Sequence, residues 1–330
     1  MEGLVVECLL NPGAFTFQGK TWLLLRVAER PERRQDEVSA LLIDPSAKHG
    51  LRIFTCKKDD PNLVYGDDPR SFVYQGRPYL TTLSHLRLAV STDGINFQVA
   101  ETPTLLAEGE LETFGIEDCR VSRIENRYYL TYTAVSADGY GVGLISTEDW
   151  QTFVRHGMIL APNNKDCALF PEKINGSYFA LHRPTLATGG LGGNHIWICK
   201  SPDLLHWGEH RCLARTRPGM WDSARIGAGA APTRTKYGWL ELYHGANAQN
   251  RYCLGALLLD LDDPTRVLAR SREPIMEPLA EYEIKGFFGN VVFTNGIIEH
   301  DDTLTVYYGA SDEVICGATF SIQQILDTLD

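Results

Sequence analysis

Short, strongly hydrophobic stretches recur along the chain and dominate its pattern of apolar and polar positions. They are rich in Leu, Tyr, Trp and Thr and follow turn residues, which is typical of β-strands. Six of them begin at Gly19, Gly76, Asn126, Gly176, Tyr237 and Asp302. The start-to-start spacings are 57, 50, 50, 61 and 65 residues, about the length of a four-stranded propeller blade with its loops. The pattern predicts an all-β fold of the β-propeller type, because a β-sandwich of single-strand repeats would have shorter spacings.

A second motif follows three of these stretches. Residues 91–97, 146–153 and 201–207 each hold a Ser and an acidic turn residue and end in an aromatic side chain. They predict outer hairpins whose aromatic residues pack between blades. Helical patterns are nearly absent, and residues 322–329 predict one short amphipathic helix at the C-terminal end. Six strand copies are compatible with six blades, or with five if the chain ends share a blade.

Composition narrows the class of protein and of partner. The 330 residues are 44% hydrophobic and 22% charged, which fits one globular domain over residues 1–330. A net charge of −11 disfavours a nucleic-acid partner. The eight cysteines form no C-x-x-C pair and have no histidine at zinc-ligand spacing, so we expect free thiols and no metal site. With no signal-peptide pattern and no apolar run of about 18 residues, the expected location is cytoplasmic, without a membrane partner.

The positions eight residues before the strands form one column of the repeat, and most of its residues are polar although packing does not require it. It holds Asn11, Asp68, Asp118 and Ala168. An apolar lead-in at 114–116 predicts partial burial of Asp118, which would raise the pKa of its carboxyl and suit a general acid. Asp68 precedes Arg70 by two residues, so a salt-bridged turn and a ligand-binding role are both open for it.

The strand ends form a second column, in which three of six residues are cationic or can become so. Arg26, Arg183 and His244 end otherwise apolar strands, where an unpaired charge is costly unless a polar or anionic group meets it. Lys165 and Arg225 precede two of these strands and extend the basic group. A basic funnel within an acidic protein indicates an anion such as phosphate. Tyr243 is a candidate platform for stacking a sugar, although aromatic residues on such strands are usually core.

Four runs of sequence together resemble glycoside hydrolase family 130, the β-mannoside phosphorylases and β-mannosidases. They are FGIEDCRV, NKDCALFPEKINGSYFALHRP, WDSARIGAGAAPTRTKYGWLELYHGA and GFFGNVVFTNGIIEHDDTLTVYYGASD, within residues 114–312. The resemblance covers most of the chain and implies a five-bladed β-propeller. A segment over about residues 30–83 departs from the shorter phosphorylases, and its Asp-Asp-Pro-Arg run looks like a second copy of the catalytic motif.

The resemblance also implies roles for individual residues. Asp118 matches the catalytic aspartate of a G-x-E-D-P-R motif in which Cys119 replaces the usual proline. The implied phosphate-binding residues are Lys165, Arg183 and His244, with Arg225 where a basic residue is common. The implied sugar-binding residues are Asn11, Arg26 and Asp312; Asp68 and Tyr243 are added from the patterns above.

The expected activity is that of an inverting β-mannoside phosphorylase, which cleaves β-linked manno-oligosaccharides with inorganic phosphate and gives α-mannose 1-phosphate. Phosphate is then a co-substrate, and no cofactor is needed. The alternative is an inverting exo-β-mannosidase. Such a hydrolase needs a carboxylate base as well as the acid. Glu112, Glu172 and Glu241 are candidates for that base. A non-catalytic glycan- or protein-binding propeller is less well supported, and assembly into a homo-oligomer is a further expectation.

Overall fold

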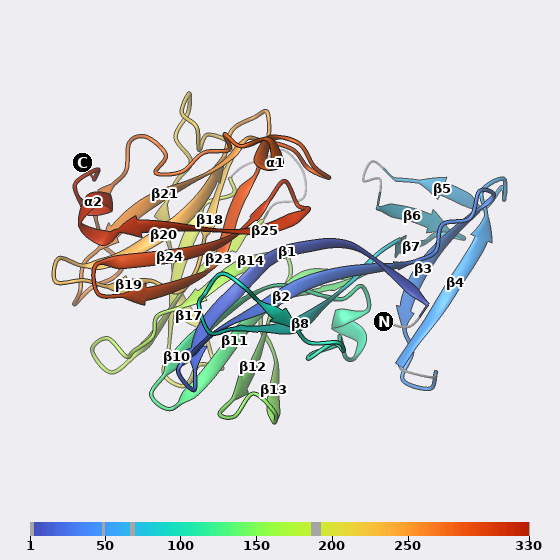
Figure 1. The fold of residues 1–330 in the computed structure, drawn as a ribbon, viewed down its shortest axis with the longest axis horizontal. Coiled ribbons are helices and arrows are strands. Elements are labelled where there is room, and N and C mark those ends of the chain that lie inside the picture. Colours follow the sequence, from blue (N-terminus) through green and yellow to red (C-terminus); the bar gives the residue numbers. More distant parts are fainter. Residues whose placement is uncertain (1–2, 48–49, 67–69, 186–192, 330) are drawn as a thin grey trace.

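The computed structural model describes residues 3–47, 50–66, 70–185 and 193–329, and it confirms the all-β fold (Figure 1). The helical elements are short: the 3₁₀ turn η2 (Glu110–Glu112) and the helices α1 (Glu281–Ile284) and α2 (Ile322–Leu326). Helix α2 confirms the predicted C-terminal helix, which ends three residues earlier than the pattern suggested. No helix in the described ranges is long and apolar enough to cross a membrane.

Five antiparallel sheets follow one another along the chain. The first sheet contains β1 (Leu4–Phe17), β2 (Lys20–Pro31), β8 (Leu83–Ser91) and β9 (Gln98–Val99). The second contains β10 (Ile116–Ile124), β11 (Arg127–Ser136), β12 (Gly139–Thr147) and β13 (Phe153–Leu160). The third contains β14 (Asn164–Leu169), β15 (Tyr178–Pro184), β16 (Ile196–Ser201) and β17 (Gly208–Ala214).

The last two sheets complete the series. The fourth contains β18 (Arg225–Ala228), β20 (Trp239–Ala246), β21 (Tyr252–Leu259) and β22 (Val267–Arg270), with β19 (Thr233–Arg234) also paired to β20. The fifth contains β23 (Val292–His300), β24 (Thr303–Ala310) and β25 (Val314–Ser321). Five of the six predicted strand copies are the second strands of these sheets.

The sixth copy belongs to a separate element, the inserted lobe (residues 37–80). The lobe contains the pair β3 (Glu37–Ile43) and β4 (Leu51–Lys57) and the three strands β5 (Leu63–Tyr65), β6 (Ser71–Tyr74) and β7 (Arg77–Leu80). Figure 1 shows it standing to one side of the five sheets. A small aromatic core of its own, with Phe54 stacked on Tyr79 at 4.6 Å, explains why its strands resemble the repeat.

Hydrophobic cores lie between successive sheets, and so do the contacts that hold them together. One contact for each successive pair is the Phe15–Trp150 ring stack at 3.7 Å, the Ser122–Leu169 hydrogen bond, the Phe170–Trp239 edge contact and the shared packing of Leu242 and Val292. The fifth sheet also contacts the first, since Asn295 donates to the carbonyl oxygen of Asn11. The first and last parts of the chain therefore lie side by side.

The predicted outer hairpins are confirmed. Asp93, Asp149 and Asp203 each accept two backbone N–H groups within their turns through one carboxylate oxygen. Phe97, which closes the first motif, packs edge-on against Tyr307 of the fifth sheet, as predicted. Trp150, inside the second motif, packs on Phe15 of the neighbouring sheet.

Register shifts interrupt the first strand of four sheets, and they place polar residues at one point of each strand. The shifts fall at Leu10/Gly13, Glu117/Arg120, Lys165/Ala168 and Thr294/Gly296. Within three of them Asn11, Asp118 and Asp166 adopt φ angles of 31°, 49° and 54°. Short Asn and Asp side chains tolerate this left-handed conformation better than other residues. Such bulges redirect a side chain out of the regular alternation, which is a common device beside binding sites.

Candidate active site

A polar cavity of about 430 Å³ opens where the bulged strands meet. Its walls include seven residues predicted from the sequence, namely Asn11, Arg26, Asp118, Lys165, Arg183, Arg225 and Asp312. Glu117, Asp166, Arg70 and Tyr252 line it as well. A larger cavity of about 570 Å³ beside α2 has mainly apolar walls and only Arg272 and Glu273 as charged residues. Of these two cavities, the smaller one therefore holds most of the charged side chains.

Asp118 lies at one side of this cavity within a cluster of donors. Its Oδ1 accepts hydrogen bonds from the side-chain amide of Asn11 and from Arg26, both at 3.0 Å. The same Arg26 guanidinium bonds to Glu117 at 2.6 Å and to the hydroxyl of Ser84 at 3.0 Å. Strands β1, β2 and β10 thus meet at one carboxylate, as the sequence columns predicted.

The electrostatics of Asp118 correct one expectation. Burial by itself favours the neutral acid, as predicted from the apolar lead-in, but Arg26, Asn11 and Arg120 outweigh burial and hold the pKa of Asp118 below its ordinary value. In the free protein this carboxyl is therefore ionised at neutral pH.

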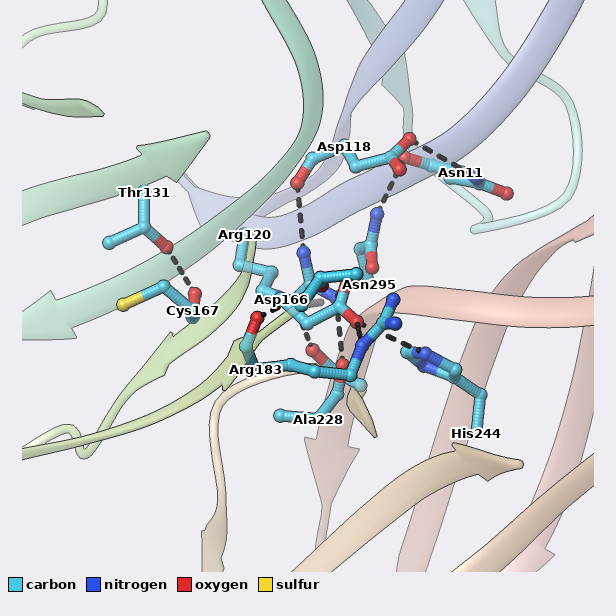
Figure 2. A network of polar contacts seen from close by, with 12 residues as sticks. Asn11, Asp118, Arg120, Thr131, Asp166, Cys167, Arg183, Ala228, His244 and Asn295 are labelled. Carbon is cyan, nitrogen blue, oxygen red and sulfur yellow. Dashed lines mark hydrogen bonds and ion pairs between the residues drawn. The ribbon is translucent and has the colours of Figure 1, made fainter. Parts of the chain in front are cut away.

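Asp166 is the second buried carboxylate of the site, and the sequence analysis missed it. Its Oδ2 accepts a hydrogen bond from Arg183 at 2.7 Å, and its Oδ1 lies 3.3 Å from Arg120 (Figure 2). Although burial opposes ionisation, Arg183, His244 and Arg120 hold the pKa of Asp166 well below its ordinary value. Gly227 leaves room for this cluster, because a Cβ there would lie 2.2 Å from Oδ2 of Asp166. That glycine serves side-chain packing.

Arg120 links the backbone of Asp118 to the carboxylate of Asp166. It is fully buried and donates to the carbonyl oxygens of Asp118, Ala228 and Gly229 as well as to Asp166 (Figure 2). A guanidinium with five fixed donors suits such a strut, since nearly every N–H finds an acceptor. Arg120 therefore fixes the position of the Asp118 backbone relative to the Asp166 side chain.

Two cations face the cavity without a carboxylate partner. Among the described residues neither Lys165 nor Arg225 forms an ion pair with an acidic group. Lys165 lies over the ring of Tyr140 at 5.0 Å, and Arg225 donates to Tyr252 and Asn250. Burial and the neighbouring Arg183 lower the pKa of Lys165. An anion entering here would meet two basic side chains that have no ion-pair partner among the described residues.

His244 does not reach the cavity surface, which corrects its predicted role as a direct phosphate ligand. The residue is fully buried, its Nε2 lies 3.2 Å from Oδ2 of Asp166, and its ring packs on Phe293. Burial lowers its pKa to about 4 despite the neighbouring carboxylate, so it is neutral at physiological pH. The structure places it behind Asp166, where it supports that side chain.

Tyr243 is not a sugar-stacking platform. It precedes His244 on β20, and because side chains alternate along a strand it faces the opposite side. There it is fully buried, stacks on Trp221 at 5.5 Å and donates to Asp222 at 2.9 Å. The hypothesis of a stacking platform at Tyr243 was wrong, and the alternative that this aromatic belongs to the core is the one observed.

Of the two remaining predicted residues, one lines the cavity and the other lies outside the described part of the chain. Asp312 lines the cavity, and burial raises its pKa to about 6 although Arg26 lowers it. Arg70 brings the inserted lobe to the same cavity and lies over the ring of Phe288 at 5.4 Å. Asp68 lies outside the described residues.

The candidate bases for a hydrolase lie elsewhere. Glu172 pairs with Arg234 on the surface, and Glu112 accepts from Tyr132 and Arg155. Glu241 is buried and accepts the backbone N–H of Gly229, and burial raises its pKa to about 8. None of the three lines the cavity.

Comparison with known proteins agrees with this site. A family model described as β-1,4-mannooligosaccharide phosphorylase, the model of glycoside hydrolase family 130, matches residues 60–330. The chain belongs to glycoside hydrolase family 130. The resemblance seen in the sequence is therefore confirmed.

Three relatives within family 130 are informative. The β-1,2-mannobiose phosphorylase of Listeria innocua is 45% identical over all of this chain and 93% of its own length. Its solved structure in complex with β-1,2-mannobiose matches with a TM-score of 0.92 over 99% of this chain and 93% of that chain. The 1,2-β-oligomannan phosphorylase of a Thermoanaerobacter species is 43% identical over 74% of this chain and 80% of the relative. The β-1,4-mannooligosaccharide phosphorylase of Ruminococcus albus is 32% identical over 73% of this chain and 75% of the relative.

Proposed function

We propose that this protein is an inverting β-mannoside phosphorylase that cleaves short β-1,2-linked manno-oligosaccharides with inorganic phosphate and releases α-mannose 1-phosphate. The observation that carries the proposal is the division of the cavity. One side holds a carboxylate within a hydrogen-bonded cluster, and the other presents Lys165, Arg183 and Arg225. A phosphorylase needs an acid and cations to hold its nucleophile, and this cavity offers both.

In the proposed reaction a phosphate oxygen attacks the anomeric carbon as the glycosidic C–O bond breaks, and the departing oxygen takes a proton. Asp118 supplies that proton, directly or through a sugar hydroxyl. The free carboxyl is ionised, so it must gain a proton when the substrates bind. Phosphate brings negative charge and the sugar expels water, and both effects raise the pKa of a neighbouring carboxyl.

Lys165, Arg183 and Arg225 hold the phosphate on the face of the sugar opposite the leaving group. Charge-assisted hydrogen bonds of this kind are about twice as strong as neutral ones. Asp166 orients Arg183 and His244 supports Asp166, so both are positioning residues. Asn11, Arg26 and Asp312 bind the mannosyl unit beside Asp118.

The β-1,2 linkage rests on the relatives. Three relatives named for β-1,2-linked substrates are 45%, 43% and 38% identical to this chain, whereas the relative named for β-1,4-linked substrates is 32% identical. Arg70 of the inserted lobe lines the cavity, so the lobe adds a wall beside the site, which favours a short substrate.

The test is to incubate the protein with β-1,2-mannobiose, with and without phosphate. We expect mannose 1-phosphate only with phosphate, and its α-anomer by NMR. Equal release of mannose without phosphate would identify an exo-β-mannosidase instead. Substrate binding with no turnover in either case would identify a glycan-binding protein. Running β-1,4-mannobiose in parallel tests the linkage.

We further propose that the five sheets are the blades of one five-bladed β-propeller domain spanning residues 1–330, with the lobe as an insertion. Contacts between each successive pair of sheets, and between the fifth and the first, support a ring. Eight cysteines without disulfides support a reducing, cytoplasmic location. Assembly into a homo-oligomer through a loop insertion, and the absence of nucleic-acid and membrane partners, complete the proposal.

A further inference from the structure

Three side chains on adjacent strands of the third sheet form a cluster that the proposed reaction does not use. His182 lies on β15, Cys199 on β16 and His210 on β17, and their ligand atoms all lie within 4.8 Å of one another. We propose that these three residues form a binding site for a zinc ion. The site is independent of the proposed phosphorylase activity.

Strand pairing explains how the cluster forms. His182 pairs with Trp197, and Cys199 lies two residues further along β16, so the two share one face of the sheet. A register shift between β16 and β17 lies beside His210 and brings its imidazole next to His182. The sequence separations are too long for a short zinc motif, which is why the sequence predicted no metal site.

The nitrogen atoms already have the spacing that a metal requires. Nε2 of His182 and Nδ1 of His210 are 3.1 Å apart. Two nitrogens bound tetrahedrally to zinc at about 2.0–2.1 Å are about 3.3 Å apart. The thiol of Cys199 is held only by a weak contact of 3.6 Å to the carbonyl of Ala180, so a small rotation brings its sulfur to the same point.

Asn164 prepares His182 to act as a ligand. Its side-chain oxygen lies 3.1 Å from Nδ1 of His182, so Nδ1 carries the hydrogen and Nε2 presents its lone pair toward His210. Metal-binding histidines are usually oriented by such an acceptor on the second nitrogen. His182 and Cys199 are buried and His210 is exposed, which leaves solvent access for the ion and for a water as fourth ligand.

Two imidazoles and one thiolate are ligands that zinc prefers. Binding releases one proton, from the Cys199 thiol, as the zinc–sulfur bond forms. His210 moves its hydrogen to the solvent-facing Nε2 and frees Nδ1. The bound ion would join β15, β16 and β17, and through Asn164 it would brace β14, where Lys165 follows directly. The predicted consequence is a stiffer support behind the phosphate side of the cavity.

Calorimetric titration of the chelator-stripped, dialysed full-length protein with zinc sulfate tests the site. We expect one equivalent to bind, and His210→Ala, an exposed change that keeps the fold, to weaken binding at least about tenfold. Asn164→Ala is expected to weaken it about 10- to 100-fold, as loss of an orienting partner does. His206→Ala, which removes an exposed histidine outside the cluster, is the matched control and should bind as the parent protein does.

Cobalt(II) supplies a second, spectroscopic readout. With Co²⁺ in place of zinc we expect a thiolate-to-cobalt charge-transfer band that is lost in Cys199→Ser and kept in Cys212→Ser. A band that survives Cys199→Ser, or zinc affinity unchanged in His210→Ala, would overturn the proposal. So would the absence of stoichiometric zinc binding to the folded parent protein.

Discussion

The two sides of the cavity are built alike but hold their carboxylates differently. Asp118 and Asp166 both lie in bulges of first strands, both have positive φ angles and both meet an arginine from a second strand. Arg26, however, also bonds to Glu117, whereas Asp166 is shared by Arg120 and Arg183. The arginine beside Asp118 thus has a second carboxylate partner. Asp166, by contrast, is the one carboxylate that pairs with two buried guanidinium groups within the described chain. The first arrangement allows a carboxyl to change its protonation state, and the second fixes one in place.

The largest expected effect comes from Asp118→Asn. If Asp118 provides the proton, kcat with β-1,2-mannobiose should fall about 10²- to 10⁴-fold, since positioned acid catalysis contributes that much. Stability should change little because Glu117 remains to pair with Arg26. Steady-state kinetics measure the first quantity and urea unfolding the second. An unaffected kcat would remove Asp118 from the mechanism.

Asp166→Asn should lower the stability of the protein more than Asp118→Asn does. Removing one partner of a buried ion pair costs about 3–5 kcal/mol, because the charges left behind stay buried. We expect the free energy of unfolding to drop by this amount in urea denaturation, clearly more than in Asp118→Asn. Equal losses in the two variants would show that the two sides do not differ as proposed.

Lys165→Met should act on phosphate alone. A hydrogen bond to a charged group is worth about 1.5–3 kcal/mol, so the KM for phosphate should rise about 10- to 150-fold. The KM for the mannoside should stay within about twofold. Lys173→Met, a change in the connection between β14 and β15 and outside the cavity, is the control. A rise in the mannoside KM instead would move Lys165 to the sugar side.

The smallest effect concerns pH. Asp312 has an ordinary pKa of 3.8 that burial raises to about 6, so the folded protein binds a proton that the unfolded chain releases. Its ionisation therefore costs stability as pH rises from about 4 to 6, and the full cost applies above 6. Asp312→Asn avoids that cost. The Tm advantage of the variant should grow from pH 4 to pH 7 and then level off; a constant difference would contradict the raised pKa.

Most of the Asp118 side could be predicted from sequence. Asn11 and Asp118 each stand eight residues before a second-strand copy, and the bulges occupy equivalent places in β1 and β10. On β14 the same offset selects Ala168, because the stretch from the bulge to the start of the strand copy at Gly176 is two residues longer there. Asp166, ten residues before Gly176, is the true counterpart. A search for Asp or Asn next to each strand's bulge, in place of a fixed offset, would have found it.

Other errors have equally local causes. The strand copy at Gly76 was counted with the sheets because its composition matches them, although it packs within the lobe. His244 was expected to be a cation because its strand end aligns with Arg183, and only the structure shows how completely it is buried. Burial and the exact side of a strand depend on neighbouring sheets, which spacing along one chain does not report.

The pairing of β2 with β8 has a consequence for how this chain can vary. Glu29 lies opposite Leu83, so the polypeptide leaves the first sheet and returns to it at adjacent positions. The residues between Glu29 and Leu83 take no part in the pairing of β2 with β8. Lengthening or shortening such a connection costs little closure entropy. Relatives can therefore differ in the inserted lobe, and with it in the shape of the cavity mouth. The pairing of the strands that hold the site residues stays the same.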